Sequence, residues 1–303
     1  MINSKVIILG AGPSGITAAI YFKRAGIPFI LIEKSMPGGK VALTAKVDNY
    51  PGLISIDGVD LALKFQEQLN EFDIEITYDS INKLDKVDSS FILEGDFDSY
   101  SSEYVIIATG TKERKMELPN EDKFYGRGVS FCAICDGALY KNKDVAVIGG
   151  GNSALEEALY LASIVNKVHL IHRRNEFRGD LILEEKIKEN KNIIIHTPYV
   201  PSSLLGDKNI EGLMIKNVET SIEEQINLSA VFVYIGNIPN TDYLSLEVEK
   251  ESGYIKVDED MLTSVDKLYA IGDVRNKKLR QIVTAVNDGA LAAIAIEKEI
   301  NKA

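Results

Sequence analysis

Two glycine turns of the same form limit what this chain can fold into more than any other feature of its sequence. Residues 10–15 read GAGPSG and residues 149–154 read GGGNSA, and each turn follows an apolar run and precedes a helical pattern. Glycines in such a strand–turn–helix segment let the backbone approach a pyrophosphate at the positive end of the helix. The sequence therefore predicts two dinucleotide-binding sites.

The two halves of the chain share a later feature as well. The apolar stretch 105–110 ends on Ala108, Thr109 and Gly110, and the stretch 231–236 echoes it in the second half. A buried parallel strand ends on small residues where a ligand lies across its carboxyl end. This internal repeat predicts an α/β fold with two related nucleotide-binding domains.

The residues that follow the second strand of each half differ in charge. In the first half this position is Glu33, where a carboxylate can accept hydrogen bonds from a ribose diol. At the matching distance the second half has His172, followed by Arg173, Arg174 and Arg178. Arginines accommodate a 2′-phosphate, so the second site is expected to prefer NADPH over NADH. The alternative is a solvated basic turn balanced by neighbouring acidic residues.

The only two cysteines of the chain, Cys132 and Cys135, are separated by two residues. Such a pair can close a small disulfide ring, and its thiolate commonly has a pKa near neutrality, so the pair is a predicted redox centre. Two other interpretations remain open. One is half of a zinc site, for which His169, His172 and His196 offer no second ligand pair. The other is a pair of buried structural cysteines.

Composition and charge exclude several classes of partner. The chain has 303 residues, 45% of them hydrophobic, and a formal net charge of -11, which argues against a nucleic-acid partner. No apolar run is long enough for a membrane span, and the first residues lack the pattern of a signal peptide. With only two cysteines, the protein is expected in the reducing cytoplasm, where a disulfide is catalytic.

Two further stretches bear on a ligand site. The turn-rich stretch 34–52 is long for a connection, which suggests a binding loop, although an ordinary surface loop remains an alternative. The strand expected at 267–271 ends in Gly272 and Asp273. This acid either bonds a ribose or ribitol hydroxyl or caps the turn that follows.

In this order, the motifs resemble those of the low-molecular-weight bacterial thioredoxin reductases, which are class II pyridine nucleotide-disulfide oxidoreductases. The resemblance covers essentially the whole chain. It rests on GAGPSG from 10, ATG from 108, CAICDG from 132, GGGNSALEEALYLA from 149, HRRNEFR from 172 and GDVRNKKLRQIVTA from 272. Each motif alone is common, whereas their order is specific.

The resemblance implies two Rossmann-like, three-layer domains, the second inserted into the first. The first would be a discontinuous FAD-binding domain of residues 1–112 and 239–303. The second, residues 113–238, would bind NADPH and carry the dithiol. A homodimer is also implied. Because the dithiol and NADPH would share the inserted domain, this domain is expected to rotate about hinges near 112–115 and 236–241.

The binding residues of the family carry over onto matching positions of this sequence. The expected FAD contacts are Gly10, Gly12, Pro13, Ser14, Gly15, Glu33, Gly38, Gly39, Asn49, Thr109, Gly110, Gly272, Asp273, Arg280, Gln281 and Ile282. The expected NADPH contacts are Gly151, Asn152, Ser153, His172, Arg173, Arg174 and Arg178. One departure is Lys40, where the family usually has glutamine, and a cation there bears on the local flavin contacts and potential.

The implied activity is that of a thioredoxin reductase. Electrons would pass from NADPH through FAD to the Cys132–Cys135 disulfide, and from there to oxidised thioredoxin. Cys135 is predicted to lie nearer the flavin and Cys132 to exchange with thioredoxin. Asp136 is the expected proton donor or acceptor, because no other ionisable residue adjoins the pair.

Other functions stay open on the sequence alone. A flavin disulfide reductase similar to this family can take its electrons from ferredoxin, or act on a different small dithiol protein. The intact GxGxxA and HRRxxxR motifs favour NADPH over ferredoxin. A diaphorase that uses no dithiol, or a nucleotide-binding sensor, would not need the cysteines.

Overall fold

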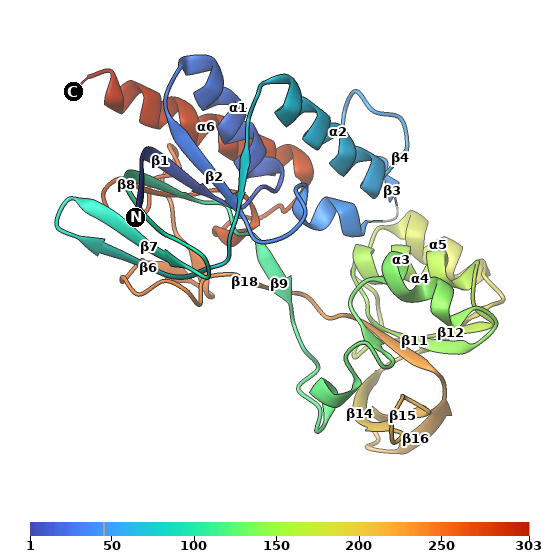
Figure 1. Cartoon of the computed structure of the whole chain (residues 1–303). Helices are drawn as coiled ribbons and strands as arrows, with labels where there is room; N and C mark the ends of the chain where they lie inside the picture. Colours follow the sequence, from blue (N-terminus) through green and yellow to red (C-terminus); the bar gives the residue numbers. More distant parts are fainter. Residues whose placement is uncertain (45, 303) are drawn as a thin grey trace. The chain divides into compact units, whose positions relative to one another are not determined.

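The computed structural model describes residues 1–44 and 46–302, and the chain divides into two compact units (Figure 1). Unit 1 consists of Met1–Lys112 and Ile238–Ala303. Unit 2 is the continuous segment Glu113–Asn237, which is inserted between the two parts of unit 1. The second boundary lies one residue before the expected one.

Two chain segments connect the units, and they pair with each other. Strand β9 (Thr111–Glu113) and strand β18 (Asn237–Pro239) form a two-stranded sheet. A further backbone hydrogen bond runs from Arg114 N to Gly236 O at 3.0 Å. Of the two segments expected to be hinges, 112–115 overlaps β9 and 236–241 contains β18.

A mostly parallel sheet forms the centre of unit 1. Its strands are β1 (Ile2–Leu9), β2 (Phe29–Glu33), β5 (Ile76–Tyr78), β6 (Ile81–Val87), β7 (Ser90–Gly95), β8 (Ser99–Ile107) and β21 (Leu268–Ala270). Their order is β5-β2-β1-β8-β7-β6, and β21 pairs with the last residues of β8. Strands β5, β2, β1, β8 and β21 are parallel, so the first glycine turn follows a central strand at their shared carboxyl edge.

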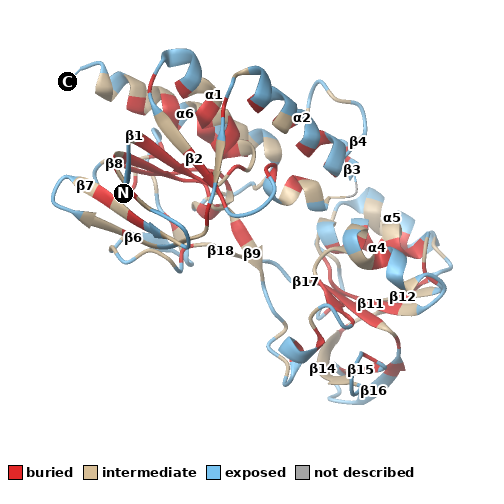
Figure 2. Ribbon diagram, in the orientation of Figure 1, coloured by how far each residue is buried: buried red, intermediate tan, exposed pale blue. Residues whose placement is uncertain are grey.

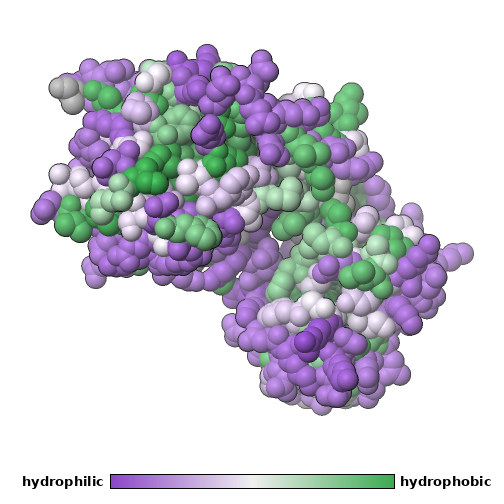
Figure 3. Space-filling model, in the orientation of Figure 1, coloured by the Kyte–Doolittle hydropathy of each residue, from purple (hydrophilic) through white to green (hydrophobic). Residues whose placement is uncertain are grey.

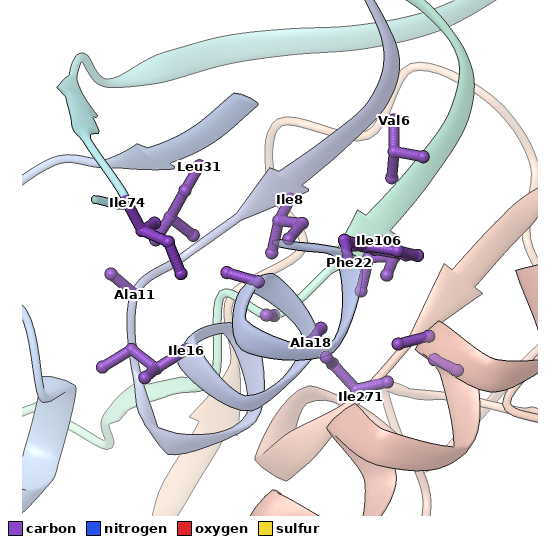
Figure 4. Packing of buried hydrophobic residues seen from close by; sticks show 14 of the residues in the cluster. Val6, Ile8, Ala11, Ile16, Ala18, Phe22, Leu31, Ile74, Ile106 and Ile271 are labelled. Atoms are coloured by element: carbon purple, nitrogen blue, oxygen red, sulfur yellow. The ribbon is translucent and has the colours of Figure 1, made fainter. Parts of the chain in front are cut away.

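Side chains alternate between the two faces of this sheet, and each face is covered. On one face Val6, Ile8 and Ile106 pack with helices α1 (Pro13–Ala25) and α6 (Ile282–Ile300), as Figure 4 shows. Helix α2 (Gly58–Glu71) packs on α1. On the other face Ile7 and Ile107 pack with residues of the β6–β7 hairpin. The strands between these layers are buried, and unit 1 has three layers (Figure 2).

Unit 2 repeats this plan with a five-stranded parallel sheet. Its order is β10-β17-β11-β12-β13, from β10 (Val129–Ser130), β17 (Ala230–Tyr234), β11 (Asp144–Gly149), β12 (Lys167–Ile171) and β13 (Ile193–His196). One face packs on α4 (Asn152–Ala162) and α5 (Leu181–Glu189). The other packs on the antiparallel sheet of β14 (Tyr199–Leu205), β15 (Gly212–Asn217) and β16 (Glu223–Asn227). This sheet and α5 were not predicted from the sequence.

The remaining elements are short. They are η1 (Gly39–Leu43), β3 (Lys46–Val47), β4 (Ile56–Asp57), η2 (Glu121–Phe124), α3 (Ala133–Asp136), η3 (Gly137–Tyr140), β19 (Lys250–Glu251), β20 (Tyr254–Ile255) and η4 (Gly272–Val274). The loop expected at 34–52 contains η1 and β3, and Ala45 within it lies outside the described residues.

None of the helices in residues 1–44 and 46–302 is long and apolar enough to cross a membrane. On the face drawn in Figure 3, hydrophilic side chains cover much of both units, and apolar side chains form small groups among them. Most of the buried apolar residues lie in the two sheets and in the layers that cover them.

Candidate functional site

The first glycine turn is closed on two sides and open on a third. A Cβ atom on Gly10 would lie 2.5 Å from Ala108 O, and one on Gly15 would lie 1.9 Å from Gly10 O. Both positions therefore require glycine. A Cβ on Gly12 would meet no atom within 4 Å. The turn thus packs tightly against its own sheet while its middle glycine faces open space, as a backbone that receives a pyrophosphate must.

Helix α1 begins directly behind this open glycine. Gly12 is its N-cap and Pro13 its first residue, while Ser14 is buried. No side chain caps the helix, and its first turn carries no acidic residue. Backbone N–H groups and the positive end of the helix dipole are therefore available to an anion.

Substitutions at two of these glycines are expected to separate folding from cofactor binding. Gly15→Ala forces a methyl group into backbone and should destabilise unit 1 by about 3 kcal/mol or more. Gly12→Ala, at an extended φ of -76°, should cost less than about 1 kcal/mol, yet weaken binding of the FAD expected from the sequence roughly tenfold because the methyl group fills the open space. Urea unfolding and FAD titration of the apoprotein measure both. Unchanged FAD affinity in Gly12→Ala would contradict the pyrophosphate assignment.

Glu33 lies at the end of β2 and braces the glycine turn. It is 9% exposed, and its Oε2 accepts a hydrogen bond from Ala11 N at 2.7 Å. Its Oε1 accepts one from Ser35 N at 2.9 Å. Ser35 Oγ donates to the same Oε1 at 3.3 Å. A carboxylate offers about four acceptor sites, so these three bonds leave one for a ribose hydroxyl.

Thr109 and Gly110 follow β8, on the strand next to the first glycine turn. Thr109 Oγ1 donates a hydrogen bond to Asn240 O at 2.8 Å. Gly110 has a positive φ of 62°, and a Cβ there would meet no atom within 4 Å. The carboxyl end of β8 therefore leaves open space beside its last residues.

The loop after β2 reaches back to the same turn. Gly38 N donates to Ala11 O at 2.7 Å, and a Cβ on Gly39 would lie 3.4 Å from the Cα of Gly12. Farther along, Asn49 Nδ2 donates to Gln281 Oε1 at 3.0 Å, just before Ile282 opens α6. The structure therefore joins the predicted loop residues to the glycine turn and to the start of α6. Lys40 lies half-buried in η1.

The turn η4 carries a buried polar atom that lacks a hydrogen-bond partner. Asp273 Oδ1 has none among the described residues, although Lys277 Nζ lies 3.6 Å away. A Cβ on Gly272 would lie 2.6 Å from Ser14 Oγ, so this turn packs on the start of α1. Arg280 Nε is likewise buried without a partner, and its guanidinium carbon lies 3.9 Å from the ring centre of Tyr254. Unpartnered polar atoms of this kind fit a ligand that supplies hydroxyl groups.

A network that sequence analysis missed fixes η4. Asp288 of α6 is fully buried and accepts hydrogen bonds from Gly272 N at 3.0 Å and from Arg275 Nε and Nη2 at 2.8 and 2.7 Å. Lys277 Nζ donates to it at 3.1 Å. A bidentate arginine and a second cation compensate the buried carboxylate, and together they hold the segment that presents Asp273. The sequence signal was an acid among the apolar residues that make up most of this helix.

The second glycine turn has the same open middle position as the first. A Cβ on Gly149 would lie 2.5 Å from Tyr234 O, and one on Gly150 would lie 2.4 Å from the ring of His172. A Cβ on Gly151 would meet nothing within 4 Å. Gly151 is also the N-cap of α4, whose first turn has no acidic residue and no side-chain cap. These observations indicate a second anion site, formed by the free backbone N–H groups at the start of α4.

Asn152 and Ser153 form the first turn of α4 behind this glycine. Asn152 Oδ1 accepts a hydrogen bond from Asp180 N at 2.7 Å, and its Nδ2 donates to Asp180 Oδ2 at 3.0 Å. Ser153 is exposed. Asn152 therefore ties the start of α4 to the segment that follows the arginine-rich loop.

That loop exposes its arginines and buries its histidine. Arg173, Arg174 and Arg178 are exposed, and Arg178 N donates to Gly150 O at 2.7 Å, which fixes the loop beside the glycine turn. His172 is 4% exposed, and its Nε2 donates to Glu176 O at 3.1 Å. Burial, and secondarily the neighbouring arginine charges, lower the pKa of His172, so it is neutral at pH 7. The arginines supply the positive charge, while the histidine supports the loop.

Cys132 and Cys135 form a disulfide with a Cα–Cα distance of 5.4 Å. Cys135 is exposed and Cys132 half-buried, so the two are not a buried packing pair. Cys132 is the N-cap of α3, and its Sγ accepts a hydrogen bond from Cys135 N at 3.2 Å. Asp136, half-buried, ends α3.

The expectation that only Asp136 adjoins the cysteines as an ionisable group is wrong. The hydroxyl of Tyr234, at the end of β17, accepts a hydrogen bond from Ala133 N at 2.9 Å, between the two cysteines. Burial and the charge of Glu157 raise the pKa of Tyr234, so its hydroxyl keeps its proton. No local sequence pattern indicates this contact, because Tyr234 lies 101 residues from Ala133, in the repeated strand.

Glu157 is the second ionisable group that sequence analysis missed. It lies on α4 among buried apolar residues, is 6% exposed, and its Oε2 has no hydrogen-bond partner among the described residues. Burial, and then the charge of Glu156, raise the pKa of Glu157 to about 7 from an ordinary value of 4.5. Its spacing from Ala154 and Leu161, three residues before it and four after it, would have predicted a core position.

Glu157→Gln is expected to flatten the dependence of stability on pH. Because the folded state raises this pKa, the protonated carboxyl stabilises the fold fully below about pH 4.5, and that stability is lost as the pH rises through about 7. Between pH 5 and pH 8 the wild type should lose about 2 to 3 kcal/mol that the glutamine variant keeps. Urea unfolding at both pH values measures this, with exposed Glu185→Gln as the control. Equal pH slopes in all three proteins would contradict it.

The class that this fold and site define is the dinucleotide-binding disulfide oxidoreductases, since a disulfide lies on a unit whose glycine turn is open to a ligand. The family model for pyridine nucleotide-disulphide oxidoreductase matches residues 4–289. The chain belongs to this family and, within it, to the low-molecular-weight bacterial thioredoxin reductases. The resemblance and the fold class predicted from the sequence are confirmed.

Individual relatives match over nearly the full chain. The thioredoxin reductase of Mycoplasma pneumoniae is 45% identical over 96% of this chain and 93% of its own length. That of Escherichia coli O157:H7 is 41% identical over 99% and 97%. The crystal structure of Lactococcus lactis thioredoxin reductase has a TM-score of 0.95 at 37% identity, with 99% of this chain and 100% of that chain covered. A ferredoxin-flavin thioredoxin reductase from Clostridium acetobutylicum is 30% identical over 100% of both chains, with a TM-score of 0.57.

Proposed function

We propose that this protein is a thioredoxin reductase that passes electrons from NADPH, through bound FAD, to the Cys132–Cys135 disulfide and then to oxidised thioredoxin. The observation that carries the proposal is the exposed disulfide on the same unit as an open glycine turn and an exposed arginine loop. The relatives named thioredoxin reductase support the choice of thioredoxin as acceptor. The flavin, when bound, would supply the hydride and electron chemistry.

In this proposal unit 1 binds FAD. Gly10, Gly12, Pro13, Ser14 and Gly15 would hold the pyrophosphate, and Glu33 the adenosine ribose. The remaining contacts would be Gly38, Gly39, Asn49, Thr109, Gly110, Gly272, Asp273, Arg280, Gln281 and Ile282. The open space at Gly12 and the unpartnered oxygen of Asp273 support this assignment.

Unit 2 binds NADPH in the same proposal. Gly151, Asn152 and Ser153 would receive the pyrophosphate, and Arg173, Arg174 and Arg178 the 2′-phosphate. His172 would act through the loop, because its ring is buried against Gly150 and Glu176. The exposed arginines support NADPH as the donor over NADH or ferredoxin.

The two thiols would have different tasks. Cys132 would exchange with thioredoxin and Cys135 would lie nearer the flavin, with Asp136 as proton donor or acceptor. The hydrogen bond from Cys135 N stabilises negative charge on Cys132 Sγ, which supports Cys132 as the nucleophile. The greater exposure of Cys135 argues for the opposite order. Iodoacetamide labelling of the reduced protein, followed by peptide mass analysis, decides between the two.

We also propose that the protein works as a homodimer in the cytoplasm and that unit 2 rotates during turnover. The family supports both proposals, and the β9–β18 connection would be the hinge. Sedimentation velocity of the FAD-loaded protein tests the dimer, and a monomer at micromolar concentration would refute it.

The decisive test is anaerobic stopped-flow absorbance of the FAD-loaded protein mixed with NADPH, NADH or reduced ferredoxin. Flavin bleaching should be fast with NADPH, slower with NADH and absent with ferredoxin. Oxidised thioredoxin added afterwards should restore the flavin absorbance. Bleaching by ferredoxin alone would favour the ferredoxin-dependent alternative. The Clostridium acetobutylicum structure, named a ferredoxin-flavin thioredoxin reductase, is the reason to test it. Fast bleaching by NADPH without reoxidation by thioredoxin would point to another small dithiol protein.

A further inference from the structure

A buried carboxyl group lies under the short helix that carries the disulfide. Helix α3 packs on α4, and Ala133 shares an apolar cluster with Ala154, Leu155 and Ala158 of α4. Glu157 belongs to the same buried side of α4. Glu157 is therefore a buried residue of the helix on which the Cys132–Cys135 segment packs.

Nothing in the described part of the protein compensates this carboxyl. Its Oε2 is buried without a hydrogen-bond partner. The strands β11, β12 and β17 and helix α5 contribute apolar side chains to the surrounding cluster. An unpaired charge is costly in such surroundings, so the carboxyl is poised between its neutral and charged forms near pH 7.

Tyr234 contacts the disulfide ring through Ala133, and the charge of Glu157 acts on its hydroxyl. Its hydroxyl accepts the Ala133 N–H and feels the charge of Glu157. Ala133 is the residue that follows Cys132, so a change at the hydroxyl acts on the backbone of the ring itself. Three other ionisable groups act electrostatically on Glu157 or Tyr234. Glu156 on α4 acts on Glu157, and Asp136 on α3 and Glu113 on β9 act on Tyr234.

We propose that Glu157 holds the second proton of the reduced dithiol, and that Tyr234 is the positioning residue that links it to the ring. The proposal rests on the proposed disulfide-reductase function. Two electrons and one proton, supplied by the reduced flavin, break the Sγ–Sγ bond and leave one thiolate and one thiol. The new negative charge disfavours a second charge on Glu157, whose carboxylate then takes one proton from solvent. The reduced ring thereby stays a reactive thiolate while the unit gains no net charge.

The test is the rate of iodoacetamide alkylation of the reduced, FAD-loaded protein at pH 6 and pH 8. At pH 6 the carboxyl is neutral, so Glu157→Gln and the wild type should react within about twofold of each other. At pH 8 the wild-type carboxylate opposes the thiolate, so Glu157→Gln should react about three- to tenfold faster. Glu185→Gln, which removes an exposed carboxylate on α5 that does not perturb Glu157 or Tyr234, should match the wild type at both pH values. A ratio that is the same at both pH values, or an equal effect in Glu185→Gln, would overturn the proposal.

A second measurement needs no variant. Infrared difference spectra of the wild type at pH 7 should gain the carbonyl stretch of a protonated carboxylic acid when the disulfide is reduced. The absence of this band would overturn the proposal even if Glu157→Gln failed to fold. If only this proposal is wrong, the protein still reduces thioredoxin with NADPH, and the ratio of the alkylation rates of Glu157→Gln and the wild type is the same at pH 6 and pH 8. If the proposed function is wrong, the NADPH-dependent reduction of thioredoxin is itself absent.

Discussion

Cys135→Ser is expected to abolish thioredoxin reduction while leaving the flavin reducible by NADPH. A serine hydroxyl cannot form a disulfide with Cys132, so the variant has no ring that can accept two electrons from the flavin and pass them on. The loss should be at least about a thousandfold in kcat, as for other enzymes that lose a covalent nucleophile. NADPH-dependent reduction of oxidised thioredoxin and anaerobic bleaching of the flavin measure the two halves separately.

The matched control is Ala138→Ser, which adds a hydroxyl to an exposed position on η3 without removing a sulfur. It should keep wild-type activity within about twofold. Thioredoxin reduction retained by Cys135→Ser would refute the dithiol as the exchange centre. If the flavin of Cys135→Ser no longer bleaches with NADPH, Cys135 is instead needed for electron transfer from NADPH to the flavin.

Removal of two arginines is expected to have the second-largest effect. Arg173→Ala combined with Arg174→Ala should lower kcat/KM for NADPH by tenfold to a few hundredfold. A charge-assisted hydrogen bond contributes about 1.5 to 3 kcal/mol, and solvent exposure of both arginines reduces this contribution. NADH lacks the 2′-phosphate, so its kcat/KM should change by less than about twofold. Because both arginines are exposed, added salt should erode the wild-type preference for NADPH.

Lys186→Ala is the control for this experiment, because Lys186 is an exposed cation on α5 outside the loop. It should leave the ratio of the two kcat/KM values unchanged. A double arginine variant that loses activity equally with NADPH and NADH would show that the loop is structural. A variant with an unchanged ratio would favour the interpretation as a solvated basic turn.

The parts of the site that were predictable are those encoded by local patterns. The glycine turns at 10–15 and 149–154 and the pair Cys132 and Cys135 carry their geometry in a few adjacent residues. A glycine that must avoid a carbonyl oxygen, as Gly15 avoids Gly10 O, leaves its mark in the sequence itself. The repeat of these patterns also predicted two sheets of the same kind, which the structure contains.

The parts that were missed depend on distant segments that meet. In the sequence, Asp288 is an acid among the mostly apolar residues of α6, and only the fold brings Arg275 and Lys277 onto it. His172 matched the position of a ligand contact, yet its ring fills the space beside Gly150. Glu157 follows an exposed acid of the same type, and only the packing of α4 shows which of the two is buried. Spacing along the chain does not report such long-range burial.

The pairing of β9 with β18 has a consequence for how the chain folds. Unit 1 is built from two pieces separated by the whole of residues 113–237, and closing a flexible loop of that size costs about 4 kcal/mol of chain entropy. Unit 2 is continuous and can fold first, and its two ends then emerge side by side as paired strands. Folding of unit 2 would thus bring the chain that carries β21 and α6 close to the N-terminal part of unit 1. There β21 can pair with β8, and α6 can pack on α1. Mutations that destabilise unit 2 should therefore slow the folding of unit 1, even where they touch none of its residues.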